Sequence, residues 1–268
     1  MAITIQSTLS STNSNAIDPS QRRLNETMER IATGVRIAQA SDNAAMLGLA
    51  TSLSTEVRSY NMARQNANDG IAMAQVGQTD LQSVQDDLQR LRELAAQAGN
   101  GILTDDDRAN IQLEAAEIKE QIAQTIEGSQ FNENSILNST GSISLQTGID
   151  EGETTDIQLR DLNGLAAGVD LSTQAGAQAA LSEIDSALNT TSDYAAYLGS
   201  QANGLEGVAD RVSQIAINSE AARSRVQDAN MAVEMASQAS ETVRLQSYMA
   251  VRAQAQQMAA STITQLLS

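Results

Sequence analysis

Apolar residues recur along this 268-residue chain in long runs of alternating three- and four-residue steps. One run extends from Ala74 to Ala98, and a second extends from Leu205 to Ala236. This spacing places the side chains on a single stripe of a helix and is typical of a coiled-coil seam. The pattern predicts one long helix over about 44–98 and a second that begins near 175, and the two can lie antiparallel. The predicted fold class is therefore mainly α.

The two ends of the chain carry shorter amphipathic patterns. Residues 5–33 predict a first helix, and the tail from Met249 to Leu267 remains amphipathic. Neither segment has enough apolar surface to fold alone, so each needs a partner helix. The positions that we expect to pack in a coiled coil of the two ends are Leu24, Met28, Ile31, Val226, Val233, Leu266 and Leu267.

Gly34 and the residues after it predict a bend between the first helix and the long one. Glycine tolerates the backbone conformations that end helices, which favours a short connector over 34–43. Ser41 and Asp42 occupy the N-cap position of the next helix. We expect Gly34 and Arg36 to form the bend.

The middle of the chain predicts one shorter helix and one hairpin. Thr104 and the three aspartates after it favour a helix over 104–128, because hydroxyl and carboxylate oxygens accept hydrogen bonds from the free N–H groups of a first turn. The period changes to two near 142–161, which predicts a β-hairpin that we expect at the far end of the core. Residues 162–176 are expected to form a loop.

The composition argues against catalysis. The chain contains no His, no Cys and no Trp, and only one Phe. Histidine is the commonest general base and metal ligand, and cysteine is the only side chain that supplies a thiol nucleophile. We therefore expect no catalytic residue, no metal site, no cofactor and a structural protein rather than an enzyme.

The net charge of −17 is unevenly distributed. Residues 1–42 contain four basic and four acidic side chains, and residues 224–268 contain three of each. Residues 43–223, with 9 basic and 26 acidic side chains, therefore carry the whole excess. Neutral ends can pack closely without mutual repulsion, whereas an acidic middle stays solvated. Negative charge also disfavours nucleic acid and anionic membranes as partners.

The sequence predicts neither a membrane-spanning helix nor a cleavable signal peptide. No run of about 18 apolar residues is present. The first residues lack a basic region followed by an apolar one.

Six stretches carry sequence that is more specific than periodicity. They are SQRRLNETMERIATGVRIAQASDNAAMLGLA (20–50), NANDGIAMAQ (66–75), LQRLRELAAQAGNG (88–101), FNENSIL (131–137), AARSRVQDANMAVEMA (221–236) and QLLS (265–268). Together they resemble bacterial flagellin, the subunit of the flagellar filament, over both ends and nearly the whole chain. Asn43 stands where this family usually has Asp, and Met46 stands where it usually has Gly.

The resemblance implies a domain organisation. Residues 1–42 and 224–268 would pair as terminal helices that form the inner coiled coil of a filament. Residues 43–223 would form a helical core domain with the hairpin near 142–161. The separate outer variable domain that flagellins usually insert beyond the hairpin is expected to be absent, which gives a minimal form.

The resemblance also implies a function and partners. The chain would polymerise with itself into the flagellar filament for motility. It would be secreted through the flagellar type III export apparatus with a chaperone, and would meet the filament cap and the hook-junction proteins in the extracellular flagellum. The alternatives are the hook–filament junction protein, which resembles flagellin at both ends, or another exported coiled-coil assembly protein.

Four residues resemble the stretch that the vertebrate toll-like receptor for flagellin recognises. They are Gln89, Arg90 and Leu94, with Glu114 on the following helix. Arg90 and Leu94 lie one turn apart and so share a face. The same residues are expected to pack in the core or between subunits, so a purely structural role is the alternative to receptor binding.

Overall fold

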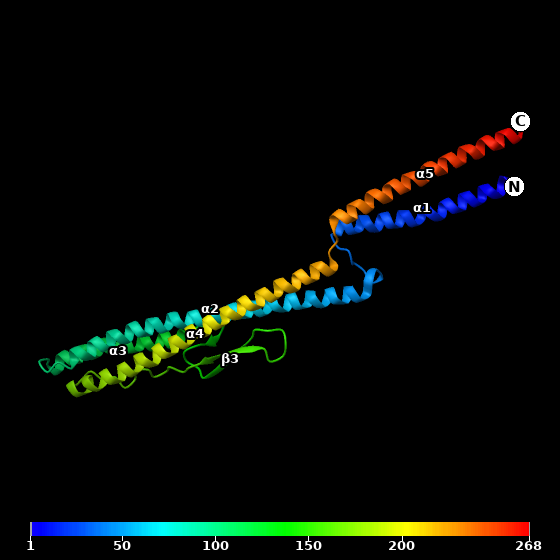
Figure 1. Cartoon of the computed structure of the whole chain (residues 1–268). Helices are drawn as coiled ribbons and strands as arrows, with labels where there is room; N and C mark the ends of the chain where they lie inside the picture. The colour runs from blue at the N-terminus through cyan, green and yellow to red at the C-terminus, as the bar shows by residue number, and fades with distance from the viewer. Residues whose placement is uncertain (1, 268) are drawn as a thin grey trace. The chain divides into compact units, whose positions relative to one another are not determined.

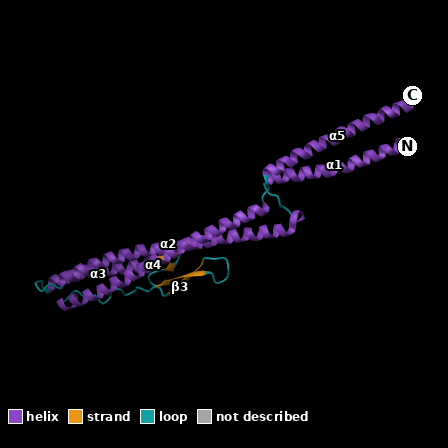
Figure 2. Ribbon diagram, in the orientation of Figure 1, coloured by secondary structure: helices purple, strands orange, loops and turns teal. Residues whose placement is uncertain are grey.

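The computed structural model describes the backbone of residues 2–267 and the side chains of residues 17–258, 260 and 261. In chain order its elements are α1 (Ala2–Thr33), α2 (Ala40–Ala98), α3 (Asp105–Gly128), β1 (Gln130–Phe131), β2 (Asn134–Ser135), β3 (Gly141–Gln146), β4 (Thr154–Leu159), α4 (Gln174–Gln227) and α5 (Met231–Leu267). Helices dominate and two small antiparallel strand pairs accompany them (Figure 2). The predicted mainly α fold is confirmed.

The chain divides into two compact units. The terminal unit consists of residues 1–55 and 219–268, and the core unit consists of residues 56–218. Helices α2 and α4 contribute residues to both units. The sequence analysis predicted boundaries at residues 42 and 224, where the neutral ends of the chain give way to the acidic middle. A boundary inside a continuous helix, such as those in α2 and α4, leaves no mark on the apolar spacing.

Within the core unit, α2 runs antiparallel to α3 and α4 (Figure 1). The stripe predicted between Ala74 and Ala98 faces inward, as its alternating spacing requires. The largest buried side chains of this core are Leu81, Leu88, Leu91 and Leu94 of α2, Ile122 and Ile126 of α3, and Ile184, Tyr194 and Leu198 of α4. Aliphatic residues thus supply nearly all of the packing, in agreement with the scarcity of aromatics.

The predicted hairpin is formed by β3 and β4, which pair from Gly141–Leu159 to Gln146–Thr154. Its position differs from the prediction. Asn66, in the first half of α2, donates a hydrogen bond of 2.8 Å from Nδ2 to the Gln146 carbonyl. The hairpin therefore lies along the side of α2 and α4, and the far end of the core unit is the turn between α2 and α3.

Two stacked tyrosines of α4 fix the base of the hairpin. The rings of Tyr194 and Tyr197 are 6.0 Å apart, and the Arg160 guanidinium lies 5.4 Å from the Tyr194 ring centre. The Tyr197 hydroxyl accepts a bond of 2.8 Å from the Gln158 N–H, and the Tyr194 hydroxyl donates to the Gln158 carbonyl at 3.2 Å. Burial raises the pKa of Tyr194 to about 12, so this hydroxyl remains a donor at neutral pH.

Glycine permits the close approach of the hairpin to the helices. A Cβ atom on Gly70 would overlap the Leu145 side chain of β3 and would lie 2.9 Å from Leu205 Cδ1 of α4. The position therefore requires the absence of a side chain and not an unusual backbone conformation. Three elements meet at this glycine.

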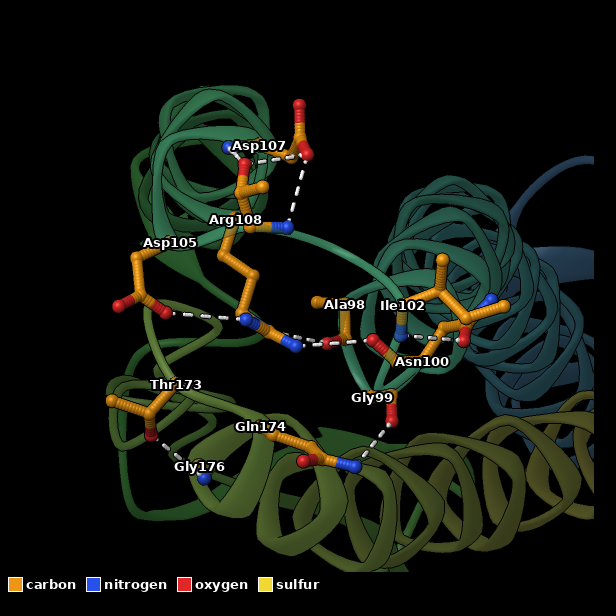
Figure 3. A network of polar contacts seen from close by, with 11 residues as sticks. Ala98, Gly99, Asn100, Ile102, Asp105, Asp107, Arg108, Thr173, Gln174 and Gly176 are labelled. Atoms are coloured by element: carbon orange, nitrogen blue, oxygen red, sulfur yellow. Dashed lines mark hydrogen bonds and ion pairs between the residues drawn. The ribbon is translucent and has the colours of Figure 1, made fainter.

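A buried arginine closes the far end of the core unit (Figure 3). Arg108 donates from Nε to the Ala98 carbonyl and from Nη2 to the Asn100 carbonyl, both at 3.0 Å, and pairs with Asp105 at 3.2 Å. The Ala98 carbonyl belongs to the last residue of α2, where helical partners run out and the helix dipole favours a cation, and the Asn100 carbonyl belongs to the turn that follows. The predicted start of α3 is a complete capping box of Thr104 and Asp107.

The loop between β4 and α4 lies along α3. Lys119 donates to the carbonyls of Ala167 and Val169, at 2.9 and 3.0 Å. The Gln112 side chain accepts a bond of 2.6 Å from the Leu171 N–H. These long-range bonds hold the loop in place although it has no regular secondary structure.

The second long helix is not continuous, which contradicts the prediction. The chain leaves the helical conformation at Asp228 and resumes it at Met231. The Asn230 side chain accepts bonds from the N–H groups of Ala232 and Val233 and so caps α5. The apolar spacing continues across this break. Asp228 and Asn230 are the signal for it in the sequence, because Asp and Asn side chains compete with the helix for backbone hydrogen bonds.

We expect Gly70→Ala to lower the free energy of unfolding of the core unit by about 1–3 kcal/mol, because the new methyl group overlaps Leu145. Gly207→Ala on α4 is the matched control, since a Cβ there meets nothing within 4 Å. The control should gain up to about 1 kcal/mol from helix propensity. Urea unfolding followed by circular dichroism measures both, and equal stabilities would contradict the close approach.

Arg108→Met should destabilise the core unit by about 1–3 kcal/mol, because it removes the side-chain donor of the buried Ala98 carbonyl and one of the two donors of the Asn100 carbonyl. Arg92→Met is the matched substitution at an exposed ion pair, in which Nε lies 2.7 Å from Asp185 Oδ1. An exposed pair contributes little. Thermal unfolding should separate the two variants clearly, and similar melting temperatures would show that Arg108 does not close the bundle.

Candidate assembly surfaces

Two connectors lie side by side within the terminal unit. The first, residues 34–39, follows α1, and the second, residues 228–230, joins α4 to α5. Val35 and Asp228 form an antiparallel β-bridge. Segments from the two ends of the sequence are therefore joined by backbone hydrogen bonds.

Gly34 ends α1 in the left-handed conformation, with φ +70°. Its N–H donates to the Arg30 carbonyl at 2.8 Å, and its own carbonyl accepts a bond of 2.9 Å from the Ala229 N–H. A Cβ would meet nothing within 4 Å, so the requirement for glycine is conformational and not steric. The structure thus places Gly34 at the bend and also bonds it to the second connector.

Arg36, the other residue predicted at the bend, contacts the end of α4. Its N–H donates to the Gln227 carbonyl and its Nη2 donates to the Val226 carbonyl, both at 2.7 Å. These are terminal carbonyls of a helix, where a cation is favoured. Arg36 therefore acts as a C-terminal cap for α4, a role that its position in the sequence did not reveal.

Two residues share the start of α2. Asp42 Oδ2 accepts bonds from the N–H groups of Gln39 and Ala38, both at 3.0 Å, and these bonds lower the pKa of Asp42. Asn43 has extended backbone angles, and its Oδ1 accepts a bond of 3.1 Å from the Met46 N–H. Asn43 is thus the N-cap of the long helix, while Asp42 holds the connector.

The seam between α1 and α5 contains both apolar and polar residues. The two helices run antiparallel side by side (Figure 1). Every residue of the seam is buried or half-buried: Ile17, Ser20, Leu24, Thr27 and Ile31 on α1, and Glu234, Gln238, Glu241, Leu245 and Tyr248 on α5. Both sets follow the three-and-four spacing of a coiled coil. The pair therefore has the spacing of a coiled coil, but half of its seam positions are polar.

Glu241 is the central charged group of this seam. Its Oε1 lies 3.3 Å from Arg23 Nε of α1 and 3.3 Å from Arg244 Nη1 of α5. Its Oε2 is buried without a hydrogen-bond partner among the described residues. Removing a carboxylate from water is costly unless its partners compensate fully, so this layer adds little stability to the isolated pair.

Part of the predicted packing stripe is wrong for the single chain. Met28 is 50% exposed and Val233 is 56% exposed. Their neighbours Thr27 and Glu234 occupy the seam instead. At these two positions the prediction chose the apolar neighbour of the residue that lies in the seam. Leu24, Ile31 and Val226 are half-buried, and the side chains of Leu266 and Leu267 lie outside the described residues.

The apolar side chains displaced from the seam are on the outside of the terminal unit. The exposed large ones are Met28 on α1 and Met231, Val233, Met235, Val243, Met249, Val251 and Met258 on α5. Eight large apolar side chains are therefore exposed on these two helices of the terminal unit.

The residues predicted for receptor binding lie on the core unit. Arg90 Nη2 is 2.6 Å from Glu114 Oε1 and Nη1 is 3.0 Å from Glu93 Oε2, and these hydrogen bonds raise the pKa of Arg90. The structure thus joins Arg90 of α2 to Glu114 of α3 on the surface, with Gln89 exposed beside them. Leu94 does not belong to this surface. It is 2% exposed in the core, so its predicted role as an apolar contact for a receptor is wrong.

No metal-binding cluster of three or more acidic side chains occurs in the described part of the chain. Within the same residues, no helix has both the length and the apolarity needed to cross a membrane.

Two family models cover most of the chain. The model described as "Bacterial flagellin N-terminal helical region" matches residues 6–142, and the model described as "Bacterial flagellin C-terminal helical region" matches residues 181–267. Residues 143–180 between them contain most of the hairpin, the loop and the start of α4.

Relatives of similar length support the same assignment. The flagellin of Halalkalibacterium halodurans is 33% identical over 236 residues, which cover 86% of this chain and 87% of that protein. The flagellar filament 33 kDa core protein of Treponema phagedenis is 30% identical over 259 residues, which cover 89% and 91%. The crystal structure of Bacillus cereus flagellin is 28% identical with a TM-score of 0.52, and the match covers 55% of this chain and 88% of that one.

Gly34→Ala should destabilise the paired connectors by about 1–2 kcal/mol, because alanine resists the left-handed conformation. The amides of Arg36, Ile37 and Ala229, which donate between the connectors, should then exchange with solvent roughly tenfold faster. Gly34→Asn is the matched control, since Asn adopts this conformation more readily. Unchanged exchange in the alanine variant would contradict the role given to Gly34.

Proposed function

We propose that this chain, which belongs to the bacterial flagellin family, builds the flagellar filament by packing the apolar outside of its terminal unit against other copies of itself. Members of this family are structural subunits, and this chain polymerises with itself as a subunit of the extracellular flagellar filament. The proposal concerns which of its surfaces pack against other copies in the filament. Each contact between identical copies that does not close on itself extends a filament.

The observation that carries the proposal is the way polar and apolar residues are distributed in the terminal unit. Carboxylates lie in the seam between α1 and α5, and valines and methionines lie outside it. The terminal unit also carries no net charge, because residues 1–55 and 219–268 contain eight basic and eight acidic side chains. Neutral apolar helices can gather at high density, as the inner part of a tube requires.

The core unit is suited to the outer part of the same filament. Residues 56–218 contain 8 basic and 25 acidic side chains and so carry the entire net charge of −17. Its own apolar core is complete, and an acidic surface keeps it solvated. We therefore assign residues 1–42 and 224–268 to the inner coiled coil and residues 43–223 to the surrounding wall, without a separate outer domain.

Further partners follow from this role and belong to the proposal. Export by the flagellar type III apparatus, with a chaperone that covers the apolar terminal helices, would deliver the chain to the growing end. There it would meet the filament cap, and the first copies would meet the hook-junction proteins. The role is structural throughout, without catalysis. A hook–filament junction role is the less favoured alternative, because both family models and the relatives reported above are flagellins.

Recognition by a host toll-like receptor is a narrower proposal. It rests on the exposed Gln89, Arg90 and Glu114 side chains, with Leu94 only supporting them from the core. Arg90 already binds Glu114 and Glu93, so a receptor would have to share or replace these ion pairs. Arginine is frequent at such contact centres because it offers several donors and an apolar stem.

Val243→Asp tests the packing proposal, because Val243 is 61% exposed on α5 and should be buried between copies. Burying a valine contributes about 1.5–3 kcal/mol, and a buried carboxylate reverses that gain. We expect the variant to require a more than roughly tenfold higher concentration to polymerise. Electron microscopy and sedimentation of the purified full chain, seeded with filament fragments, measure this.

Val243→Ile is the matched control, since it keeps the position apolar, and it should polymerise like the unmodified chain. The core unit of both variants should unfold at the unmodified temperature. Polymerisation of Val243→Asp at the unmodified concentration would contradict the packing proposal. Failure of the unmodified chain to form filaments would instead contradict its assignment as a filament subunit.

A further inference from the structure

The methionines of this chain are concentrated on exposed helix surfaces. Of the eight whose side chains the structure describes, seven are at least 41% exposed, and only Met73, in the core unit, is buried, at 3% exposed. Five of the seven belong to α1 and α5. Methionine packs well into irregular apolar contacts, but an exposed thioether sulfur is also open to oxidants.

Three of these methionines occupy equivalent positions beside the seam between α1 and α5. Met28, Met235 and Met249 each directly follow a seam residue, which turns all three toward the same rotational side of their helix. The two helices run antiparallel (Figure 1). Residues on the same rotational side of two antiparallel helices lie on the same side of the pair. The three sulfurs are therefore presented on one side of the terminal unit.

The register of the two helices brings two of these methionines together. The ion pair between Arg23 and Glu241 joins α1 to α5. Met28 lies five residues after Arg23, and Met235 lies six residues before Glu241, so the two methionines are level along the pair. Met231 precedes Met235 by one turn on the same face of α5. We call Met28, Met231, Met235 and Met249 the methionine face.

The composition directs oxidants to methionine. The other side chains that react readily with two-electron oxidants, those of Cys, Trp and His, are absent from the chain. When hydrogen peroxide reacts with a thioether, the sulfur attacks one peroxide oxygen, and the S–O bond forms as the O–O bond breaks. The sulfur loses two electrons and the remaining oxygen leaves as water. An apolar side chain thereby becomes a polar sulfoxide.

We propose that peroxide oxidation of the methionine face prevents this chain from joining the filament. The inference rests on the proposed function, in which the outside of the terminal unit packs against other copies. A sulfoxide needs water or a hydrogen-bond donor, and an apolar contact between copies supplies neither. Within the filament the same contact covers the sulfurs and protects them. Assembly and oxidation therefore exclude each other at the same four side chains.

Timed peroxide treatment followed by mass spectrometry of peptides measures the oxidation of each methionine. In the unpolymerised chain, the methionine face should be oxidised at least roughly tenfold faster than the buried Met73. In intact filaments the same four residues should react at least roughly tenfold more slowly than in the unpolymerised chain. Equal oxidation of the methionine face in both forms would contradict the inference.

Seeded polymerisation of the treated chain measures the effect on assembly. The oxidised chain should need a more than roughly tenfold higher concentration to polymerise. Methionine sulfoxide reductases A and B, supplied with a dithiol, should restore polymerisation. They return each sulfur to the thioether as the dithiol becomes a disulfide and the oxygen leaves as water.

A variant with Met28→Leu, Met231→Leu, Met235→Leu and Met249→Leu is the matched control. It keeps the volume and apolarity of the face. It should polymerise like the unmodified chain both before and after peroxide treatment. Met62→Leu removes an exposed methionine of the core unit instead, and this variant should remain as sensitive to peroxide as the unmodified chain.

The outcomes distinguish this inference from the proposed function. Normal polymerisation of the oxidised chain would overturn the inference. So would an equal loss in the leucine variant, because the damage would then lie at other methionines. If the leucines themselves impair assembly, the reductases decide: recovery supports the inference, and no recovery overturns it. Failure of the untreated, unmodified chain to form filaments would contradict the proposed function instead.

Discussion

The terminal helices cannot bury their apolar surface within one chain. Where α1 and α5 meet, the seam contains Thr27, Glu234 and Glu241, and an arginine from each helix is needed to balance Glu241. A buried ion pair of this kind contributes little stability, but it can select one register over others. The valines and methionines of α5 remain outside. Burial of this surface is the main driving force left for other copies to supply.

The core unit satisfies its own requirements and can therefore serve as a platform. Its aliphatic stripes close against one another, Arg108 caps the end of α2, and tyrosines fix the hairpin to α4. Its acidic surface keeps it solvated. Within the terminal unit, hydrogen bonds at Gly34 and Arg36 join the first connector to the second connector and to the end of α4.

Much of the fold could be predicted because helix periodicity, turn residues and caps act locally. The α2 stripe, the start of α3 at Thr104, the presence of a hairpin near 142–161 and the end of α1 at Gly34 all follow from neighbouring residues. The prediction was wrong where contacts with distant segments of the chain determine the local structure. The apolar spacing continues through Asp228–Asn230, but pairing with the first connector ends the helix there. Likewise, Met28 is as suitable for a seam as Thr27 until the position of α5 is known. One feature of the sequence could have identified the seam. Ser20 and Thr27 are seven residues apart, as are Glu234 and Glu241, and seven residues is the repeat of a coiled coil.

We expect α1 and α5 to gain most of their stability from other copies, whereas the core unit folds independently. Hydrogen–deuterium exchange of the unpolymerised chain and of the filament, followed by mass spectrometry of peptides from 17–33, 231–258 and 74–98, measures this most directly. The account predicts rapid exchange of α1 and α5 in the unpolymerised chain, strong protection in the filament, and equal protection of α2 residues 74–98 in both. Protection of α1 and α5 as strong as that of α2 before polymerisation would contradict it.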